Sequence, residues 1–406
     1  MTGKLLDIKA AAGLVLAEVS ALDAEAVDLA DARGRFTAAS VPSAADLPGF
    51  DNSVMDGFAV RSVDTVGAGQ GNAVSLEVIG ESRAGAPSDT VLGAGQAIGI
   101  STGARIPEGA DSVLQKEVVD IDGKHISSTT EVEPGHDIRR QGEVTRAGDV
   151  VIAAGVKIGP VEAGALAATG HGKVSCHRRP TVSLLTSGDE LVEPGRPLGP
   201  GEIWNSNQFA VSSLVAESGA ELISAGTVPD RLDATVSALE KGLEADLTVI
   251  CGGVSVGEHD HVKPALAELG VDEIFWGLAL KPGRPTWFGR RGDARVLGLP
   301  GNPVSALVVF RLLALPLLRA LSGGPARTPK VTGRLASPVK RLPGRLHAVP
   351  CHPAADGHPD DLVPMPQLGS HDFLSLLGAT TLALIEPGSG SAEAGEEVET
   401  LPLGGH

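Results

Sequence analysis

The chain has 406 residues, of which 42% are hydrophobic and 20% are charged, and it carries a formal net charge of −17. Its length allows two to four domains, and its composition is typical of globular proteins, so a sizeable buried core is expected. The acidic balance argues against a nucleic-acid-binding surface, which is normally basic. An anionic substrate would therefore have to be held by a local cluster of donors.

Cysteine usage and hydropathy exclude further classes of protein. The three cysteines are far apart and odd in number, so neither a disulfide framework nor a zinc-ribbon spacing is present. The N-terminal sequence MTGKLLDIKA lacks the apolar region of a signal peptide, and the most apolar stretch, 303–321, contains two arginines and an internal proline. We expect a soluble, cytoplasmic protein without a membrane-spanning segment.

The N-terminal part of the chain changes character along its length. Residues 4–31 place Leu, Ala and Val at helical spacing and predict helix. Residues 46–139 hold short apolar runs between Gly, Pro and Asp turns, which predict a β-rich insert. Residues 150–170 predict a strand, a Gly-Pro turn and a helix.

From Pro180 onward, apolar strands alternate with helical stretches. The predicted strands are 181–185, 221–225, 247–251 and runs near 274–280 and 295–299. The predicted helices are 207–218, 232–244, 262–269 and 303–321. This alternation predicts a βαβ parallel sheet with helices on both faces, a doubly wound α/β domain. Residues 329–402 are broken by Pro and Gly into short strands and predict a small all-β module.

The sequence Gly-Leu-Pro-Gly-Asn-Pro-Val-Ser-Ala at 298–306 has the form of a Gly-rich turn that leads into a helix. Asn302 suits a helix N-cap, and Pro303 suits the first helical turn. The glycines allow the backbone to approach a ligand, and the N–H groups of a helix N-terminus favour an anion. Ser305 adds a hydroxyl in the first turn. The pattern fits either an anion site or an ordinary capped helix.

Other strands of the predicted sheet also run into polar residues, at 186–190, 226–230 and 252–261. In open α/β sheets, ligands bind beyond the carboxyl ends of the strands. Lys281 and Arg284 supply two cations nearby. Each segment alone is more often a turn, but together they gather anion donors, cations and carboxylates at one edge. Phosphate and carboxylates together indicate a divalent metal ion, Mg²⁺.

Eight motifs, which occur in order along nearly the whole chain, together resemble those of the MoeA family, the molybdopterin molybdenumtransferases. The eukaryotic relatives of this family include the E domain of gephyrin. The motifs are DNSVMDGFAV (51–60), STGARIPEGAD (101–111), DIRRQGE (137–143), TSGDEL (186–191), CGGVSVGEHDH (251–261), KPGRP (281–285), GLPGNPVSA (298–306) and QLGS (367–370).

The resemblance implies an α/β multidomain protein of four domains that forms a homodimer. A helical and extended linker domain would comprise 1–45 and 140–178, and a β-rich inserted domain would comprise 46–139. A domain shared with the MoaB and MogA proteins would comprise 179–325, and a small barrel-like β domain 326–406.

The resemblance also implies an activity. The family inserts molybdate into the dithiolene of adenylylated molybdopterin and releases AMP in a Mg²⁺-dependent step. The implied substrates are molybdate and adenylylated molybdopterin, and the implied cofactor is Mg²⁺. A further copy of the chain and the molybdopterin adenylyltransferase are the implied protein partners, without nucleic acid or membrane.

Functional positions carry over from the resemblance residue by residue. The implied catalytic residues are Asp56, Thr102, Glu190, Asp230, Asp260 and Lys281, of which Asp230 and Asp260 would bind the metal and orient water. The implied substrate-binding residues are Arg139, Ser187, Gly188, Gly252, Gly253, Ser255, Arg284, Pro300, Gly301, Asn302, Ser305 and Ser370. The inserted domain would face the α/β domain of the partner subunit, so the site would be shared across the dimer.

Three positions depart from the family pattern. Gly277 stands where many relatives have a lysine, and Pro350 stands where relatives have an arginine implicated in oxyanion binding. Phe58 replaces a tyrosine. With two cations missing, we expect weak affinity for molybdate. Because of these departures, two alternative functions remain: a low-activity paralogue, or a non-catalytic molybdopterin-binding scaffold.

Several tempting sites are less favoured. His259 and His261 lack a third metal ligand at a recognisable spacing. The Cys351-His352 pair lies in a Pro-rich stretch, and Cys251 follows an apolar strand, as a small buried residue does. A molybdopterin adenylyltransferase is a further alternative, but those enzymes have Gly-Gly-Thr-Gly where this chain has Gly-Gly-Val-Ser-Val-Gly, and they lack the other domains.

Overall fold

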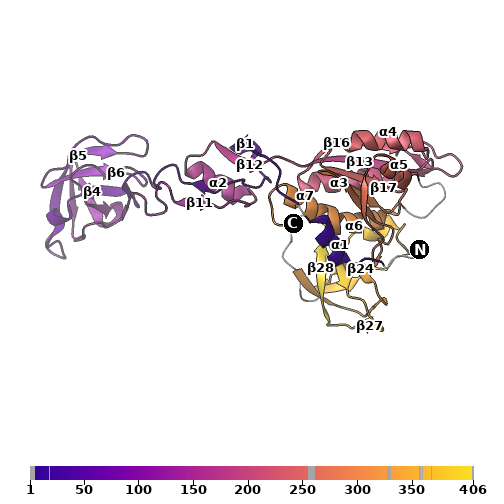
Figure 1. Ribbon diagram of the computed structural model, residues 1–406. Helices are drawn as coiled ribbons and strands as arrows, with labels where there is room; N and C mark the ends of the chain where they lie inside the picture. Colours follow the sequence, from indigo (N-terminus) through magenta and orange to yellow (C-terminus); the bar gives the residue numbers. More distant parts are fainter. Residues whose placement is uncertain are drawn as a thin grey trace. The chain divides into compact units, whose positions relative to one another are not determined.

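The computed structural model describes residues 5–17, 19–254, 261–326, 331–355, 358, 360–366 and 368–404. The chain forms two compact units (Figure 1). The first unit comprises Met1–Glu25, Gly34–Ala38 and Ser175–His406, and the second unit comprises Ala26–Arg33 and Ala39–Val174. The four domains implied by the family resemblance remain a prediction.

The second unit is built around a six-stranded sheet with the order β7-β4-β6-β5-β9-β8. The strands are β4 (Gly57–Val60), β5 (Val74–Ser82), β6 (Gln96–Ile100), β7 (Ser112–Gln115), β8 (Val119–Asp122) and β9 (His125–Ser128). Phe58, Leu76, Leu114 and Ile126 form the centre of its core. The prediction of a β-rich region between residues 46 and 139 is confirmed.

Short elements complete the second unit and its boundary. They are β1 (Ala24–Asp28), η1 (Leu29–Asp31), β2 (Val41–Pro42), β3 (Asn52–Ser53), η2 (Ser62–Thr65), η3 (Lys116–Val118), β10 (Ile138–Arg139), β11 (Val150–Ile152), α2 (Pro160–Ala168) and β12 (Lys173–His177). Strand β11 and helix α2 confirm the strand and helix predicted within 150–170.

The helix predicted over 4–31 is wrong for most of its length. Helix α1 covers only Ile8–Val15, and Asp7 caps it by accepting hydrogen bonds from the N–H groups of Lys9 and Ala10. Residues 24–28 form strand β1, which pairs with β12. Alanine and valine fit either period, and pairing with a distant strand overrides the local helical preference.

The first unit contains the predicted α/β sheet, with the order β16-β13-β17-β21-β20-β18. The strands are β13 (Thr181–Ser187), β16 (Glu221–Val228), β17 (Leu247–Cys251), β18 (Asp272–Trp276), β20 (Trp287–Arg291) and β21 (Ala294–Leu299). Four neighbouring strands, from β16 to β21, are parallel, whereas β20 runs antiparallel to β21 and β18 runs antiparallel to β20. The sequence analysis missed β20, which forms a hairpin with β21.

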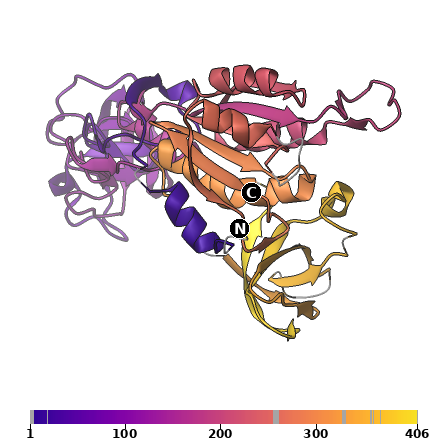
Figure 2. The ribbon, with the colours of Figure 1, turned by 45° about the vertical axis from the view of Figure 1, so that its right-hand side comes forward.

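Helices cover both faces of this sheet (Figures 1 and 2). One core joins β17 residues Leu247 and Val249 to α3 (Ser206–Ser218), α6 (Pro303–Val309) and α7 (Leu315–Leu321). The opposite core joins the β17 residue Ile250 to α4 (Leu232–Gly242) and α5 (Val262–Glu268). Alternate residues of one strand therefore face different helix layers, which confirms the doubly wound α/β prediction.

The apolar stretch 303–321 is a buried core helix with a π-helical middle. Residues Phe310–Ala314 (η4) join α6 to α7. By length and composition alone this helix could cross a membrane, but 67% of its most apolar window is buried inside the protein. Arg311, only 5% exposed, donates to the Glu217 carboxylate at 2.9 Å and to the carbonyl of Leu403.

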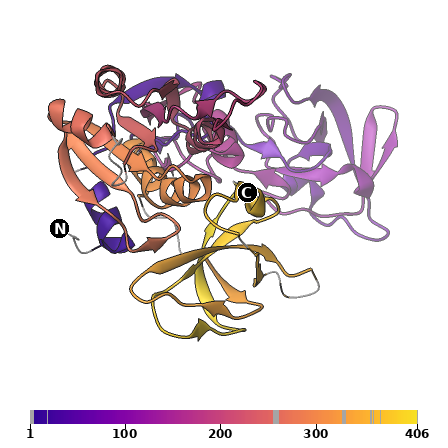
Figure 3. The same cartoon turned by 90° about the vertical axis from the view of Figure 1, so that its right-hand side faces the viewer.

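The C-terminal part of the first unit is the predicted β module (Figure 3). Its elements are β22 (Val331–Leu335), β23 (Val339–Lys340), β24 (Leu346–Pro353), β25 (Asp361–Pro364), η5 (Phe373–Leu376), β26 (Thr381–Ile385), β27 (Ser391–Ala392) and β28 (Glu397–Pro402). Strands β24, β25, β22, β28 and β26 pair in a closed ring, because β24 also pairs with β26. The barrel-like prediction is confirmed.

One strand joins the barrel to the α/β sheet region. Strand β19 (Leu280–Lys281) pairs in parallel with β24, with Leu280 opposite Leu346 and Lys281 opposite His347. The KPGRP motif is thereby placed beside the C-terminal module. The remaining short strands, β14 (Leu191–Val192) and β15 (Ile203–Trp204), pair with each other near the carboxyl end of β13.

Candidate functional site

The loops after β13 and β16 are locked together by carboxylates. The Ser187 hydroxyl donates to Asp230 Oδ1 at 2.9 Å, and the Asp189 N–H lies 3.4 Å from Asp230 Oδ2. In return, the Asp230 N–H donates to Asp189 Oδ1 at 3.0 Å. Because both loops leave the carboxyl ends of neighbouring parallel strands, Ser187 and Asp230 are held side by side, as the sequence analysis expected.

Asn205 holds the same two strands against the start of α3. Its amide Nδ2 donates to the hydroxyls of Thr186, at 2.7 Å, and of Thr227, at 3.0 Å. Its Oδ1 accepts the Gln208 N–H, so Asn205 also caps the helix. The side chain is buried, with 3% exposure. The sequence analysis did not single out this residue.

Gly252 brings the backbone after β17 close to the loop after β13. Its φ of +89° is in the left-handed region, and a Cβ here would lie 2.8 Å from the Ser187 carbonyl oxygen. The Gly252 N–H donates to the Leu299 carbonyl at 3.1 Å. Only glycine fits this close approach. The loop after β17 can therefore contact both the end of β13, at Ser187, and the end of β21, at Leu299.

A cavity of about 400 Å³ lies at these strand ends. It is lined by Ser187, Glu190, Leu191, Ile203, Trp204, Asn205, Ser206, Asn207, Cys251, Pro285, Pro300, Gly301, Asn302 and Pro303. Asn207 donates to the Gly301 carbonyl at 2.6 Å, which ties α3 to the Gly-rich turn. We refer to this space as the strand-end cavity.

The Gly-rich turn leads into α6 as predicted, but its cap differs from the prediction. Asn302 occupies the N-cap position, yet its side chain makes no capping bond and donates to the Ser370 hydroxyl at 2.9 Å. The Val304 N–H is taken by the Ser370 carbonyl at 3.2 Å. A residue far along the chain therefore competes with the local cap and joins the turn to the C-terminal module.

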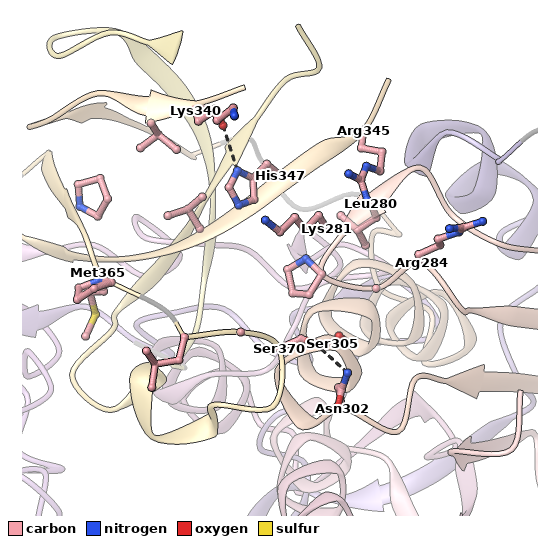
Figure 4. A pocket seen from close by; sticks show the side chains of 18 of the residues that line it. Leu280, Lys281, Arg284, Asn302, Ser305, Lys340, Arg345, His347, Met365 and Ser370 are labelled. Atoms are coloured by element: carbon pink, nitrogen blue, oxygen red, sulfur yellow. Dashed lines mark hydrogen bonds between the residues drawn. The ribbon is translucent and has the colours of Figure 1, made fainter. Parts of the chain in front are cut away.

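A second, larger cavity of about 720 Å³ lies between the α/β sheet region and the C-terminal barrel (Figure 4). Its lining includes the predicted residues Lys281, Arg284, Pro300, Asn302, Ser305 and Ser370. The barrel contributes three nitrogen-bearing side chains that the sequence analysis missed, namely Lys340, Arg345 and His347. We call this space the basic cavity. It shares Pro285, Pro300 and Asn302 with the strand-end cavity.

His347 lies in the wall of the basic cavity with its Nδ1 atom 3.2 Å from the Lys340 carbonyl oxygen. Burial lowers the pKa of the His347 imidazole. The hydrogen bond to Lys340 raises this pKa, whereas the positive charges of Lys281 and Arg345 lower it further. The net pKa is below the ordinary value, so the ring is neutral at pH 7 when the cavity is empty of anions.

The second unit contains a further pair of predicted residues in contact. Asp56 Oδ1 accepts the backbone N–H of Thr102 at 2.6 Å and its hydroxyl at 2.9 Å. The N–H bond and then the hydroxyl bond hold the pKa of the Asp56 carboxyl below its usual value. The third predicted residue of this unit, Arg139, is exposed and pairs with Glu143 at 3.2 Å.

Two predicted site residues, Ser255 and Asp260, lie outside the described residues. Gly188, Gly252 and Gly253 lie in the loops after β13 and β17. Within the part of the chain that the structure describes, no group of three His, Cys, Asp or Glu side chains is placed to hold a metal ion. The one predicted metal ligand that is described is therefore Asp230.

The cysteines behave as buried apolar residues. Complete burial raises the pKa of the Cys251 thiol to about 12, and burial raises the pKa of the Cys351 thiol to about 11. A thiol is nucleophilic only as the thiolate, so neither residue is poised as a nucleophile at pH 7.

Two of the three departures from the family pattern, Gly277 and Pro350, have structural correlates. Gly277 has a φ of +87°, so a lysine at this position would be strained in the present backbone. Pro350 is buried in β24 opposite Leu382, and its carbonyl accepts the Met365 N–H at 2.8 Å. Neither residue lines the basic cavity.

Comparisons with known proteins agree with this architecture. Models of the MoeA N-terminal region (domains I and II), of a probable molybdopterin binding domain and of the MoeA C-terminal region (domain IV) match residues 6–170, 183–320 and 332–403. The fold and the site thus define a multidomain protein with a molybdopterin-binding type of α/β domain.

Relatives match over nearly the full length. The molybdopterin molybdenumtransferase of Haemophilus influenzae is 36% identical over 93% of this chain and 94% of its own. Molybdopterin molybdenumtransferase 1 of Mycobacterium tuberculosis is 32% identical over 94% of this chain and 95% of its own. A crystal structure of the molybdopterin biosynthesis MoeA protein of Pyrococcus horikoshii superposes with a TM-score of 0.85 at 32% identity, over 99% of this chain and 100% of that one. The chain belongs to the MoeA family of molybdopterin molybdenumtransferases.

Proposed function

We propose that this protein is a molybdenum insertase, which transfers molybdenum from molybdate to the dithiolene of adenylylated molybdopterin with release of AMP. The observation that carries the proposal is the pair of adjoining cavities, which share Pro285, Pro300 and Asn302. One is lined by cations and suits a dianion. The other lies at the carboxyl ends of parallel strands, where open α/β sheets bind organic ligands. The names of the relatives support the same assignment.

The residues of the basic cavity would hold molybdate. Lys281 and Arg284 would donate charge-assisted hydrogen bonds to its oxygen atoms, and the Ser305 hydroxyl would add a neutral donor. Replacement of one oxo group by the two sulfur atoms of the dithiol releases one water and leaves the oxidation state of molybdenum unchanged. The step therefore needs positioning and charge neutralisation rather than an oxidant.

The residues of the strand-end cavity would hold the adenylylated pterin. Ser187 and Glu190 line this cavity beside the Gly301 turn, and Asp230 is hydrogen-bonded to Ser187. Asp230 with Asp260 would hold Mg²⁺, because carboxylate oxygens are the ligands this ion prefers and those of Asp230 have lone pairs to spare beyond two protein bonds. The bound ion would neutralise phosphate charge. Asp230 and Asp260 would also orient the water that attacks the phosphoanhydride, and Glu190 would act beside them from the cavity wall.

We further propose a cytoplasmic homodimer with a shared site. Asp56 and Thr102 lie in the second unit, whereas the two cavities lie in the first. In this proposal, Asp56 and Thr102 of one subunit complete the cavities of the other, and the molybdopterin adenylyltransferase delivers the organic substrate.

The test is AMP release from adenylylated molybdopterin in the presence of molybdate and Mg²⁺. Asp230→Asn and Glu190→Gln should each lower the rate by about 100-fold or more, because positioning and electrostatic groups contribute effects of this size. Glu240→Gln, which changes an exposed carboxylate of α4, is the matched control and should react like the unaltered protein. A scaffold or a low-activity paralogue would bind the pterin with little AMP release, and an adenylyltransferase would instead consume ATP. Either result contradicts the proposal.

A further inference from the structure

The basic cavity contains more positive charge than the family motifs predict. Lys281 and Arg284 belong to the KPGRP motif, whereas Lys340 and Arg345 come from the C-terminal barrel, outside the eight motifs. All four side chains line the same cavity (Figure 4). Two barrel cations therefore join those of the motif in this cavity, while the family cations at Gly277 and Pro350 are absent.

His347 lines the same cavity as these cations. Parallel pairing of β19 with β24 places His347 directly opposite Lys281, and Figure 4 shows the ring between Lys340 and Lys281. A carbonyl oxygen only accepts hydrogen bonds, so the contact with the Lys340 carbonyl requires a hydrogen on Nδ1. In the neutral ring, Nε2 then has a free lone pair and is the atom that can take up a proton.

We propose that Lys340, Arg345 and His347 complete the oxyanion site of this chain, and that the His347 ring takes up a proton when a tetrahedral dianion enters the basic cavity. The identity of that dianion as molybdate rests on the proposed function. The protonated ring would donate from Nε2 to the anion while Nδ1 keeps its bond to Lys340.

The charges around His347 explain the coupling. Lys281 from β19 and Arg345 from the turn before β24 are the cations whose charge acts on the ring. Lys340 from β23 contacts the ring through its carbonyl oxygen, and Arg284 from the turn after β19 lines the same cavity. On the neighbouring strand β26, Ile385 is opposite His347. The carboxylate that follows it, Glu386, pairs with Lys9 at 2.9 Å and lines a different cavity.

Within the described residues, the groups that face His347 are thus cations, which disfavour a charged ring. A bound dianion cancels this repulsion and adds an attraction, so it raises the pKa of the ring. Binding then takes up as much as one proton at a pH between the two pKa values, near the ordinary histidine value of about 6.5. By linkage, affinity for the dianion increases as the pH falls through this window, by up to about tenfold per pH unit.

The first experiment is calorimetric titration of the full-length protein with sodium molybdate at pH 6.5 and 8, in two buffers with different enthalpies of ionisation. The unaltered protein should take up a substantial fraction of a proton at pH 6.5. His347→Gln should take up almost none and should lose the pH dependence of affinity. Equal proton uptake by both proteins would overturn the assignment of the proton to His347.

The second experiment tests the two barrel cations. Lys340→Gln and Arg345→Gln should each weaken molybdate binding by about tenfold, which corresponds to about 1.4 kcal/mol. Arg345→Lys should restore part of the loss, because the charge is kept. Lys241→Gln and Arg33→Gln alter exposed cations elsewhere and should bind like the unaltered protein. Unchanged affinity in both Lys340→Gln and Arg345→Gln would contradict the proposed site.

These outcomes are separate from those of the proposed function. Molybdate binding with proton uptake but without AMP release would leave the oxyanion site intact and refute the insertase assignment. Molybdate-dependent AMP release without proton uptake would support the insertase assignment and refute the proposed role of His347. Circular dichroism of each variant shows whether a loss of binding reflects a loss of folding.

Discussion

Replacement of Gly252 by alanine should leave the protein folded but remove most of its activity. The substitution has two costs in the structure. Alanine in a left-handed backbone conformation costs roughly 1–2 kcal/mol, and Gly252 has a φ of +89°. In addition, the new Cβ would lie 2.8 Å from the Ser187 carbonyl oxygen, so the loop that carries Ser187 must shift. Because small displacements of positioning groups can cost on the order of 100-fold in rate, we expect AMP release to fall by about 10- to 100-fold.

Gly219→Ala is the matched control for this prediction. Gly219 ends α3 with a φ of +82°, but the nearest atom to its Cβ position is Arg179 Nη1 at 3.9 Å, so only the backbone cost applies. Both variants should therefore lower the melting temperature by several degrees, roughly 2–4 °C per kcal/mol. Only Gly252→Ala should lose most of the AMP release when both are assayed well below their melting temperatures. Equal activity in the two variants would refute the argument that the Gly252 approach positions Ser187.

Three further predictions concern stability, reactivity and assembly. Burial raises the pKa of Asp246, but hydrogen bonds from Arg178 and Thr181 outweigh it and hold the pKa below its usual value. This carboxylate therefore stabilises the fold above the unfolded pKa of about 3.9 and loses that contribution as the pH falls through the folded pKa. Asp246→Asn should lower the melting temperature at pH 7. The difference in calorimetric melting temperature between this variant and the unaltered protein should vanish near pH 2. Cys251, fully buried with a pKa of about 12, should resist iodoacetamide at pH 8 in the native protein and react after unfolding, as mass spectrometry can show; rapid native labelling would contradict the burial. Subunit exchange between Asp56→Asn and Asp230→Asn dimers should restore about a quarter of the activity. Half of the dimers are then mixed, and each mixed dimer has one intact site out of two. No recovery after verified exchange would show that each chain completes its own site.

The alternation of strands and helices was readable from the sequence because buried parallel strands and amphipathic helices leave strong local patterns. The predicted strand 247–251 and helix 303–321 match the structure at both ends, although the middle of that helix is π-helical. The errors lie where a distant partner decides the outcome. Residues 24–28 are a strand because β12 pairs with them, and the hairpin strand β20 has no isolated signal of its own.

The site shows the same division. Ser187, Asp230 and the 298–306 turn could be placed together because the carboxyl ends of parallel strands share an edge. The sequence did not predict the Asn302 bond to Ser370 or the barrel cations Lys340 and Arg345. The closure of the barrel brings these residues to the cavity, and no spacing in the sequence encodes that closure.

The most direct test of the central claim is the stoichiometry of the reaction. The protein is incubated with adenylylated molybdopterin, Mg²⁺ and increasing molybdate, and AMP is counted by chromatography while molybdenum bound to the pterin is counted by elemental analysis. We predict that AMP and pterin-bound molybdenum appear in a one-to-one ratio and that both depend on molybdate. AMP release that is unaffected by molybdate, or that leaves no molybdenum on the pterin, would contradict the assignment of this protein as a molybdenum insertase.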